Sequence, residues 1–570
     1  MAESLAIDAS EFRAIFGVNP DENDDVNNSE NEFQGFELSS EEESSSSEEE
    51  SEDESDEDSV KNWSEQLTHF DLEDFTGQQR LKKTVSEDAK AEDYFSLMFS
   101  DELIGLISDE TNRYARFIIG QKADREARLA KWKDVTPDEL RMFLGVALVM
   151  GINSLPQQAL YWSQNPLFGN LGIQDVIPKT RFEEIAQFLH FSDPNNEPQR
   201  GDADYDRLFK VRPVLSDVLK SIQQAYEPSK DISVDEGMIA FKGRLGFRQY
   251  MPAKPTKYGI KVWMAADANN GYVCNYKVYL GQENRQRVHG LGYDVVMDMA
   301  KPFLNSYRHI FCDNFFTTVR LFDHLLDQKT YACGTVRVNR RELPPCAKEK
   351  LKPGEMLQRQ RGQLLFTKWH DKRDVSLLST NVSPLEPGRT VRRKYRSREE
   401  IDIEKPKVTD VYTAHMGGVD RADQLRSFYS SGWQSRKWYK YVFWFLFNLA
   451  VTNAFVLEGF KRQLQGKAKR TVIVFKTELA QSLIAKFNSR KRPRVPAPPT
   501  PQNIPASAHV ATRVEGRKRA CVLCSKKGKT TPKGYKIETY YECAVCKVGL
   551  CRKGCHQAFH EMDHGTAKLS

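Results

Sequence analysis

Three aspartates, each in its own local setting, are the residues of this chain best suited to chemistry. Asp235 lies in ISVDEGMIAFKGR, Asp313 in YRHIFCDNFFTT and Asp420 in HMGGVDRADQ. Carboxylates brought close together repel one another, and a shared divalent cation removes that cost. Two Mg²⁺ ions about 4 Å apart activate an attacking oxygen and stabilise a leaving oxygen in phosphodiester chemistry. If the fold gathers these three side chains, the pattern therefore predicts a metal-dependent site.

The elements that must position the aspartates are two strands and a helix. Asp235 and Asp313 each end a short apolar, β-branched run, as expected at the tip of a buried strand. Residues 257–267 and 272–281 have strand character and are joined by Asn-Asn-Gly, which predicts a hairpin. We therefore expect a mixed α/β sheet. Asp420 opens a helical pattern, and Asp423, three residues on, lies on the same helical face.

Helical patterns flank this strand-rich region on both sides. Before it, three segments are apolar or amphipathic at helical spacing: residues 136–152, which begin with a Thr136 cap, 180–191 and 212–226. After it, the apolar run 442–457 is too short to cross a membrane and contains Asn448 and Asn453. We expect that run to be a buried helix and expect no membrane association.

The charge of the chain is distributed very unevenly. The net charge is +4, but residues 1–60 hold 22 Asp or Glu and one basic residue, which gives −21 and leaves +25 for the rest. A body this basic is expected to bind a polyanion such as nucleic acid, although a generally cationic surface would give the same count. The acidic, serine-rich segment cannot bury enough apolar surface to fold, so we expect residues 1–91 to be disordered.

The acidic tail has three possible roles that the sequence leaves open. Four serines carry an acidic residue three positions later, which suits an acid-directed kinase: Ser45, Ser47, Ser51 and Ser55. The tail could instead act as a DNA mimic that competes for the basic body, or simply as a solubilising segment.

Six of the ten cysteines are concentrated between residues 521 and 555, which predicts a local metal module rather than a disulfide framework. Eight residues supply two tetrahedral zinc sites: Cys521, Cys524, Cys543, Cys546, Cys551, Cys555, His560 and His564. His556 competes with the last two, and the spacing does not decide which histidine is spare. So short a module has little core, so zinc is expected to fold it.

Several motifs in the same order resemble the piggyBac family of DNA transposases, from about residue 132 to the end of the chain. They are the three aspartate blocks, KPTKYGIKVWM (254–264), CGTVRVNRRELP (333–344) and the Cys/His-rich tail. The resemblance implies a multidomain α/β fold with an RNase H-like catalytic core, a split helical dimerisation and DNA-binding domain, and a zinc cross-brace of the RING or PHD kind. It also implies a homodimer on double-stranded DNA that carries transposon terminal repeats and TTAA target sites.

The resemblance also assigns roles to residues. Asp235, Asp313 and Asp420 are implied to hold two Mg²⁺ or Mn²⁺ ions for 3′-end nicking, hairpin formation and strand transfer, with Asp423 as an auxiliary acid. The implied DNA contacts are Lys242, Arg244, Lys257, Asn314, Arg337, Arg340 and Trp438. Lys242 stands where the best-known member of the family has arginine, which keeps the charge without the planar fork.

The expected domain organisation follows from these motifs. After the tail come a first helical part (92–230), the catalytic core (231–338), an insertion domain (339–405), the second core part (406–429), a second helical part (430–488), a basic Pro-rich linker (489–516) and the zinc domain (517–570). The basic runs 489–494 and 516–520 suit nuclear import. Two alternatives remain: a domesticated DNA-binding protein without excision activity, and a nuclease that cuts without joining.

Overall fold

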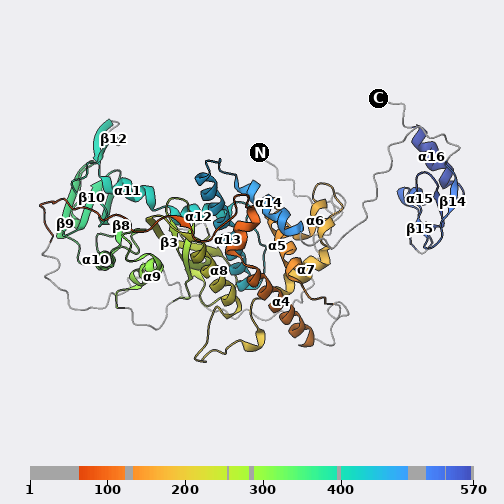
Figure 1. The fold of residues 1–570 in the computed structure, drawn as a ribbon, viewed down its shortest axis with the longest axis horizontal. Helices are drawn as coiled ribbons and strands as arrows, with labels where there is room; N and C mark the ends of the chain where they lie inside the picture. Colours follow the sequence, from red (N-terminus) through yellow and green to blue (C-terminus); the bar gives the residue numbers. More distant parts are fainter. Residues whose placement is uncertain are drawn as a thin grey trace, which may run out of the picture. The chain divides into compact units, whose positions relative to one another are not determined.

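The structure, a computed structural model, describes residues 63–121, 132–252, 256–281, 288–394, 400–485, 509–532 and 534–565. The chain forms two compact units, residues 1–489 and 490–570 (Figure 1). The four serines proposed as kinase sites and the basic run 489–494 lie outside the described residues.

A mixed nine-stranded sheet forms the centre of the larger unit. Its order is β4-β5-β3-β7-β8-β11-β10-β9, with β6 also paired to β5. The strands β3, β7 and β8 are parallel, and the other pairs are antiparallel. The bounds are β3 Asp231–Ala240, β4 Gln249–Tyr250, β5 Tyr258–Asp267, β6 Val273–Val278, β7 His309–Cys312, β8 Tyr331–Thr335, β9 Met356–Arg361, β10 Leu364–His370 and β11 Asp374–Ser379. The expected mixed sheet and the hairpin between β5 and β6 are thus confirmed.

The sheet continues past residue 339, where we expected an insertion domain (339–405) to begin. β11 pairs with β8, so β9, β10 and β11 extend the same sheet rather than building a separate one. Only the hairpin of β12 (Arg389–Lys394) and β13 (Glu400–Lys405) forms a sheet of its own in this region of the described chain. Strand partners are chosen by tertiary packing, which the local pattern of residues 339–405 does not reveal.

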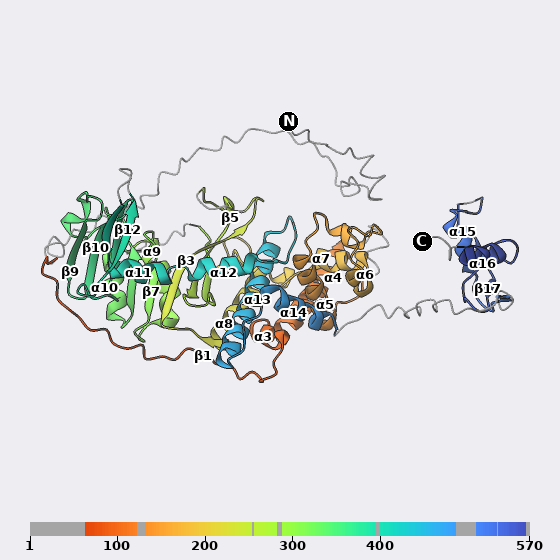
Figure 2. The ribbon, with the colours of Figure 1, turned by 90° about the horizontal axis from the view of Figure 1, so that it is seen from above.

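Helices from both ends of the larger unit pack into one assembly (Figures 1 and 2). α13 packs on α3 and α8, and α14 packs on α5 and α3, so residues 91–225 and 438–485 share one core. The bounds are α3 Ala91–Met98, α4 Asp101–Gln121, α5 Pro137–Ile152, α6 Leu171–Val176, α7 Lys179–Phe188, α8 Arg212–Ala225, α13 Trp438–Leu464 and α14 Val472–Ala485. Thr136 caps α5 as expected, accepting a hydrogen bond from the Glu139 backbone N–H at 3.2 Å.

α13 is the one helix of the described chain that is long and apolar enough to cross a membrane. Of its apolar window, 89% is buried inside the protein. This helix contains the run 442–457, which the sequence analysis expected to be buried.

The segment before α3 corrects the expected extent of the disordered tail. Residues 63–90 lie along the larger unit instead (Figure 2). Trp63 donates to the Glu342 carbonyl at 2.9 Å, Ser64 pairs with Gln360, and β1 (Arg80–Leu81) pairs with β2 (Tyr226–Glu227). Beyond the acidic run the segment gains aromatic side chains such as Trp63, whose burial offsets the entropy of ordering.

The remaining helices of the larger unit connect the sheet strands or lie against them. They are α9 Leu291–Ala300, α10 Val319–Asp327, α11 Lys407–His415 and α12 Gly418–Ser427. In the smaller unit, two short sheets pair β14 (Ala511–Arg513) with β17 (Tyr541–Cys543) and β15 (Arg519–Ala520) with β16 (Glu538–Thr539). Its helices are α15 Val522–Lys526 and α16 Cys555–Gly565.

Candidate functional site

Asp235 and Asp313 lie side by side on two neighbouring strands. Val234 of β3 pairs in register with Cys312 of the parallel strand β7, and each aspartate is the next residue. Neighbouring strands are about 4.8 Å apart, and residues opposite one another point to the same face. Asp313 is the first residue after β7, as its local pattern predicted. The expectation that Asp235 ends a strand was wrong, because β3 stays paired with β5 beyond it and continues to Ala240. The register nevertheless holds the two carboxylates side by side, at the point where the pairing of β3 with β7 ends.

α12 brings Asp420 and Asp423 to the same face. Gly418 packs so closely on β3 that a Cβ there would meet Ser233 Oγ and lie 3.1 Å from Ala268 Cα. At the other end, a Cβ on Gly237 would lie 3.7 Å from Asp423 Oδ1. Ser233 and Gly237 flank Asp235 on its own face of β3, so α12 lies along the carboxylate edge.

The two helical acids have different surroundings. Asp420 is exposed in the first turn of α12, where the helix dipole favours a negative charge. Asp423 accepts a hydrogen bond from Arg426 at 3.0 Å, and the Arg426 guanidinium lies 4.5 Å from the centre of the Phe445 ring. This ion pair anchors Asp423 to α13, which makes it better suited to positioning than to metal binding.

Burial raises the pKa of Asp313, and the Glu236 carboxylate raises it further, whereas the Arg337 guanidinium lowers it. The carboxylate also accepts a hydrogen bond from the Phe315 N–H at 2.8 Å, which fixes its orientation. A half-buried carboxylate held by a backbone hydrogen bond beside further acids is a group that a divalent cation would stabilise in its charged form.

Two arginines predicted as DNA contacts are brought to this edge. Arg337 Nε donates to Asn314 Oδ1 at 3.2 Å, and Arg340 Nη2 donates to the Phe315 carbonyl at 2.6 Å. Asn314 follows Asp313 directly, so these guanidinium groups flank the carboxylates. Arginine beside a carboxylate edge can bind the phosphate of an approaching strand through two hydrogen bonds.

The other predicted contacts belong to the connection between β3 and β5. Lys242, Arg244 and Lys257 are all exposed. Trp438, at the start of α13, packs edge-on against Phe247 with ring centres 5.3 Å apart, which places it beside the same connection. The structure thus gathers the predicted cations and Trp438 on the continuation of β3, beyond Asp235.

The donor set at this edge suits a hard cation. Three carboxylates offer the oxygen ligands that Mg²⁺ and Mn²⁺ prefer. The carboxylate oxygens of these three acids are farther apart than the ligand atoms in each Cys/His group of the smaller unit. No three acids among the described residues have their ligand atoms all within 4.8 Å of one another. The fit rests on the donor chemistry and on the shared edge of β3, β7 and α12.

Two clusters of cysteine and histidine occupy the smaller unit. One contains Cys521, Cys524, Cys551 and Cys555, and the other contains His509, Cys543, Cys546 and His560. Within each cluster the ligand atoms all lie within 4.8 Å of one another. The members of the two clusters interleave along the chain: His509 comes before Cys521 and Cys524, the pair Cys543 and Cys546 before Cys551 and Cys555, and His560 comes last. This is the interleaved arrangement that the resemblance implied.

The distances within both clusters fit a tetrahedral zinc ion. In such a site, ligand bonds of about 2.3 Å for sulfur and 2.0 Å for nitrogen place two sulfurs about 3.8 Å apart and a sulfur and a nitrogen about 3.5 Å apart. Cys524 Sγ lies 3.9 Å from Cys551 Sγ and 3.5 Å from Cys555 Sγ. Cys546 Sγ lies 3.4 Å from both His509 Nδ1 and His560 Nε2.

His509 is the member that the sequence analysis missed. It stands where His564 was predicted, and it lies within the segment 489–516 that was predicted to be linker. Its Nδ1 is 3.5 Å from Cys543 Sγ, and β14, which starts two residues later, pairs with β17. The side chain of His564 lies outside the described residues. His556 is in neither cluster, although its backbone carbonyl accepts from His560 Nδ1 at 2.7 Å.

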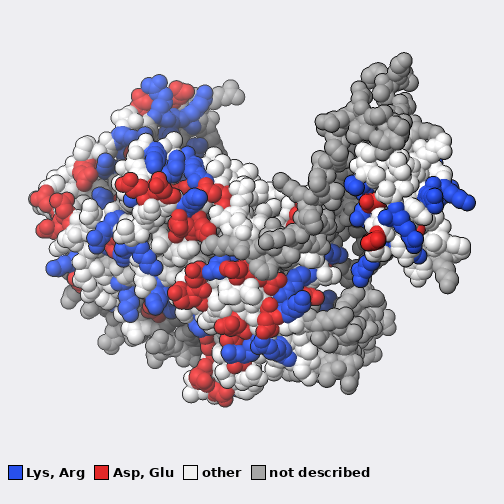
Figure 3. All heavy atoms as spheres, turned by 45° about the vertical axis from the view of Figure 1, so that its right-hand side comes forward, with Lys and Arg blue, Asp and Glu red and all other residues white. Residues whose placement is uncertain are grey.

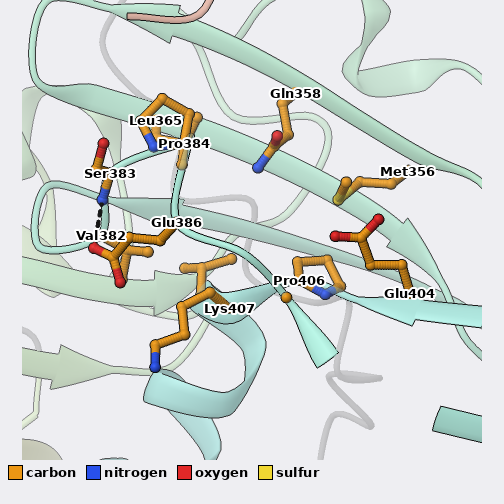
Figure 4. Close-up of a pocket in the computed structure, with 12 residues that line it drawn as sticks. Met356, Gln358, Leu365, Val382, Ser383, Pro384, Glu386, Glu404, Pro406 and Lys407 are labelled. Atoms are coloured by element: carbon orange, nitrogen blue, oxygen red, sulfur yellow. Dashed lines mark hydrogen bonds between the residues drawn. The ribbon is translucent and has the colours of Figure 1, made fainter. Parts of the chain in front are cut away.

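A pocket lies away from the carboxylates, between β9, β10, the segment 382–388, β13 and the start of α11 (Figure 4). Glu386, Glu404 and Lys407 are among its lining residues, and the Glu386 carboxylate accepts from the Ser383 N–H at 3.2 Å. The strands β8 and β11 separate β7 from β10, so this pocket is not part of the aspartate site.

Comparison with known proteins agrees with a nucleic-acid-processing site of this kind. The profile of the family described as transposase IS4 matches residues 90–455, which include the sheet, all four acids and the helical assembly up to the middle of α13. The chain belongs to this transposase family and, within it, to the piggyBac group.

Two human proteins and one solved structure illustrate the similarity to the piggyBac group. The chain is 26% identical over 479 residues to the human PiggyBac transposable element-derived protein 3, covering 81% of this chain and 75% of the relative. It is 28% identical over 381 residues to the human PiggyBac transposable element-derived protein 2, covering 64% and 60%. A piggyBac transposase synaptic complex with hairpin DNA, determined by cryo-EM, matches with a TM-score of 0.66 and 25% identity, over 84% of this chain and 98% of that one.

Proposed function

We propose that this protein is a cut-and-paste DNA transposase whose RNase H-like core breaks and joins phosphodiester bonds at Asp235, Asp313 and Asp420. The observation that carries the proposal is the placement of Asp235 and Asp313 side by side on the parallel strands β3 and β7, with α12 packed along the same face of β3. The family membership and the similarity to a piggyBac transposase bound to hairpin DNA support it.

Each residue has a distinct task in this proposal. Asp235 and Asp313 bind the cations from the sheet, and Asp420 binds them from the helix. Bound Mg²⁺ or Mn²⁺, two ions per site, would supply activation of the attacking oxygen and stabilisation of the leaving oxygen. Asp423 holds α12 in register through Arg426, while Arg337 and Arg340 neutralise the phosphates of the strand that enters.

The proposed reaction has three steps that use the same residues. Water attacks at each transposon end and frees a 3′-OH, which attacks the opposite strand and closes a hairpin. After the hairpin opens, the 3′-OH attacks a TTAA target. In each step an oxygen nucleophile attacks a phosphorus atom held at the same carboxylates and another ester oxygen leaves, so one arrangement of side chains serves all of them. We propose that a homodimer in the nucleus pairs two transposon ends; the similar piggyBac transposase, whose structure is a synaptic complex with hairpin DNA, supports this.

We further propose that the smaller unit is a zinc-folded cross-brace that binds terminal-repeat DNA. Its two clusters fit two zinc ions, and its residues 509–565 contain 12 Lys or Arg against 5 Asp or Glu. Figure 3 shows Lys and Arg side chains on the visible face of this unit. Such an excess of positive charge favours the phosphate backbone.

A second candidate is a domesticated DNA-binding protein, because two human relatives are named as transposable element-derived proteins. A cellular excision assay separates the two. The donor plasmid carries the terminal repeats that flank this gene in its genome, and wild type is compared with Asp313→Asn. Precise TTAA repair that depends on Asp313 supports the transposase. Repeat binding without excision from either protein supports the domesticated protein.

A nuclease that cuts without joining is the remaining alternative. It is tested in vitro with pre-cleaved terminal-repeat ends and a TTAA-containing plasmid. Joined products that require Asp313 are expected of a transposase, and nicks without joined products would contradict strand transfer.

A further inference from the structure

Three side chains at the outer end of the catalytic sheet form an exposed aromatic and cationic surface, here called the tyrosine platform: Arg248, Tyr250 and Tyr258. Tyr250 of β4 and Tyr258 of β5 are a cross-strand pair with ring centres 4.7 Å apart. The Arg248 guanidinium lies 5.1 Å from the centre of the Tyr258 ring. Tyr250 is 47% exposed and Tyr258 is 43% exposed. Leaving two large aromatic rings in water forgoes the free energy that their burial would contribute.

The platform is built into the sheet rather than carried on a loose loop. The Tyr258 carbonyl accepts from the Phe241 N–H at 3.3 Å, and the Met251 N–H donates to the Lys257 carbonyl at 2.7 Å. Arg248 Nη1 donates to the carbonyls of Lys242 and Gly243 at 3.0 and 3.2 Å, which hold the guanidinium in place. The rings are therefore presented in a fixed orientation.

The platform faces the same side of the sheet as the catalytic carboxylate. Asp235 pairs with Met264 of β5 in an unbroken register that runs to Ala240 and Gly259. Tyr258 is six residues from Met264, and an even separation along a strand keeps side chains on one face. Six residues span about 20 Å at about 3.3 Å per residue. With about 3.4 Å per nucleotide along a stacked strand, that is about six nucleotides.

The charge around the platform suits a polyanion. Residues 240–258 contain five Lys or Arg and no Asp or Glu. Among the described ones, Lys242, Arg244, Arg248 and Lys257 are exposed, and Arg248 lies over the Tyr258 ring. A protein partner of ordinary composition would meet four cations here, whereas a DNA strand offers phosphates to the cations and bases to the rings.

We propose that the tyrosine platform binds unpaired nucleotides of a DNA strand, about six nucleotides from the phosphate that reacts at the carboxylates. This rests on the proposed function and deepens it, because it names the form of DNA that the site takes. Base faces are hidden inside a duplex, so ring stacking selects strands that are single, frayed or distorted. Arg248 adds a cation that pairs with the neighbouring phosphate.

The test measures DNA affinity of the full chain by fluorescence anisotropy. The probes are a flush duplex and the same duplex with a ten-nucleotide single-stranded extension on one end. Tyr258→Ala is expected to weaken binding of the extended probe about tenfold while leaving the flush duplex unchanged. Tyr258→Phe keeps the ring and is expected to bind both probes as wild type does. Tyr205→Ala removes a comparably exposed ring (43%) elsewhere and serves as the matched control.

A second readout locates the contact directly. 5-Iodouracil is placed at each position of the extension in turn, and the photo-cross-linked peptides are identified by mass spectrometry. The cross-links are expected on the peptide that contains Tyr250 or Tyr258. An equal loss on both probes, or cross-links that fall only elsewhere, would overturn the proposal. Its failure is distinguishable from failure of the proposed function, because metal-dependent strand cutting by wild type and its loss in Asp313→Asn are scored separately.

Discussion

Replacing His509 with alanine is expected to remove one zinc ion from this protein and leave the other. His509 Nδ1 lies 3.5 Å from Cys543 Sγ and 3.4 Å from Cys546 Sγ, distances that suit a shared tetrahedral zinc ion. The other cluster shares no residue with it. The expected zinc content is therefore two ions per chain in wild type and about one in His509→Ala.

The size of the effect follows from the number of ligands. Structural zinc sites bind with about 10–16 kcal/mol in total, so the loss of one of four ligands costs on the order of 3 kcal/mol. That lowers the affinity by about two orders of magnitude. A chelator chosen between the two affinities will then strip the altered cluster and spare the cluster of four cysteines.

The assay measures released zinc with a colorimetric chelator, together with the total zinc of the purified full-length protein. His564→Ala is the matched control, because it removes the histidine that spacing alone favoured, and it is expected to retain two ions. Cys521→Ser should lose the other ion. Because His509 leads into β14, which pairs with β17, protease cleavage near residue 509 is expected to quicken in His509→Ala.

The reasoning would be refuted by a reversal of the two histidines. Two ions retained in His509→Ala and one lost in His564→Ala would show that His509 lies near the cluster without binding metal. Loss of both ions in His509→Ala would show that the two clusters do not fold independently, and the ligand assignment would then need the single-cysteine variants.

Three further outcomes are expected. Gly418→Ala places a Cβ against Ser233 Oγ and should displace α12, so DNA cutting should fall steeply while the zinc content and the helical circular-dichroism signal stay unchanged. The control is Gly459→Ala on α13, where a Cβ meets nothing within 4 Å, and it should be as active as wild type. Burial lowers the pKa of Lys440 to about 7 in the folded protein. Between pH 7 and the pKa of Lys440 in the unfolded chain, the unfolded state binds more protons, so the free energy of unfolding should rise with pH by on the order of 1 kcal/mol per pH unit. The thermal midpoint of Lys440→Met should lack this rise. Deleting residues 1–60 removes a charge of −21 and should tighten non-specific DNA binding and steepen its salt dependence, and unchanged affinity at low salt would exclude the tail as a competitor.

The local patterns were sufficient wherever a residue's role depends on its immediate neighbours. The apolar runs before Asp235 and Asp313 predicted two strands that end at these residues; β7 does end directly before Asp313, whereas β3 continues past Asp235 to Ala240 because it stays paired with β5. Thr136 predicted the start of α5, and the cysteine pairs predicted two metal clusters, seven of whose eight members were named in advance. The catalytic and DNA-contact roles themselves stay predictions, because they depend on bound metal and DNA.

Short sequence patterns identified the candidate side chains, because strand character, helix caps and Cys-x₂-Cys spacing are properties of neighbouring residues. Tertiary structure alone decided which of them meet. β9, β10 and β11 could have formed a separate sheet by pattern, but pairing of β11 with β8 joined them to the core. His509 has no local signal, since its partners Cys543 and Cys546 are more than thirty residues away. Tyr250 and Tyr258 become one surface only through a cross-strand register, which depends on contacts distant in the chain.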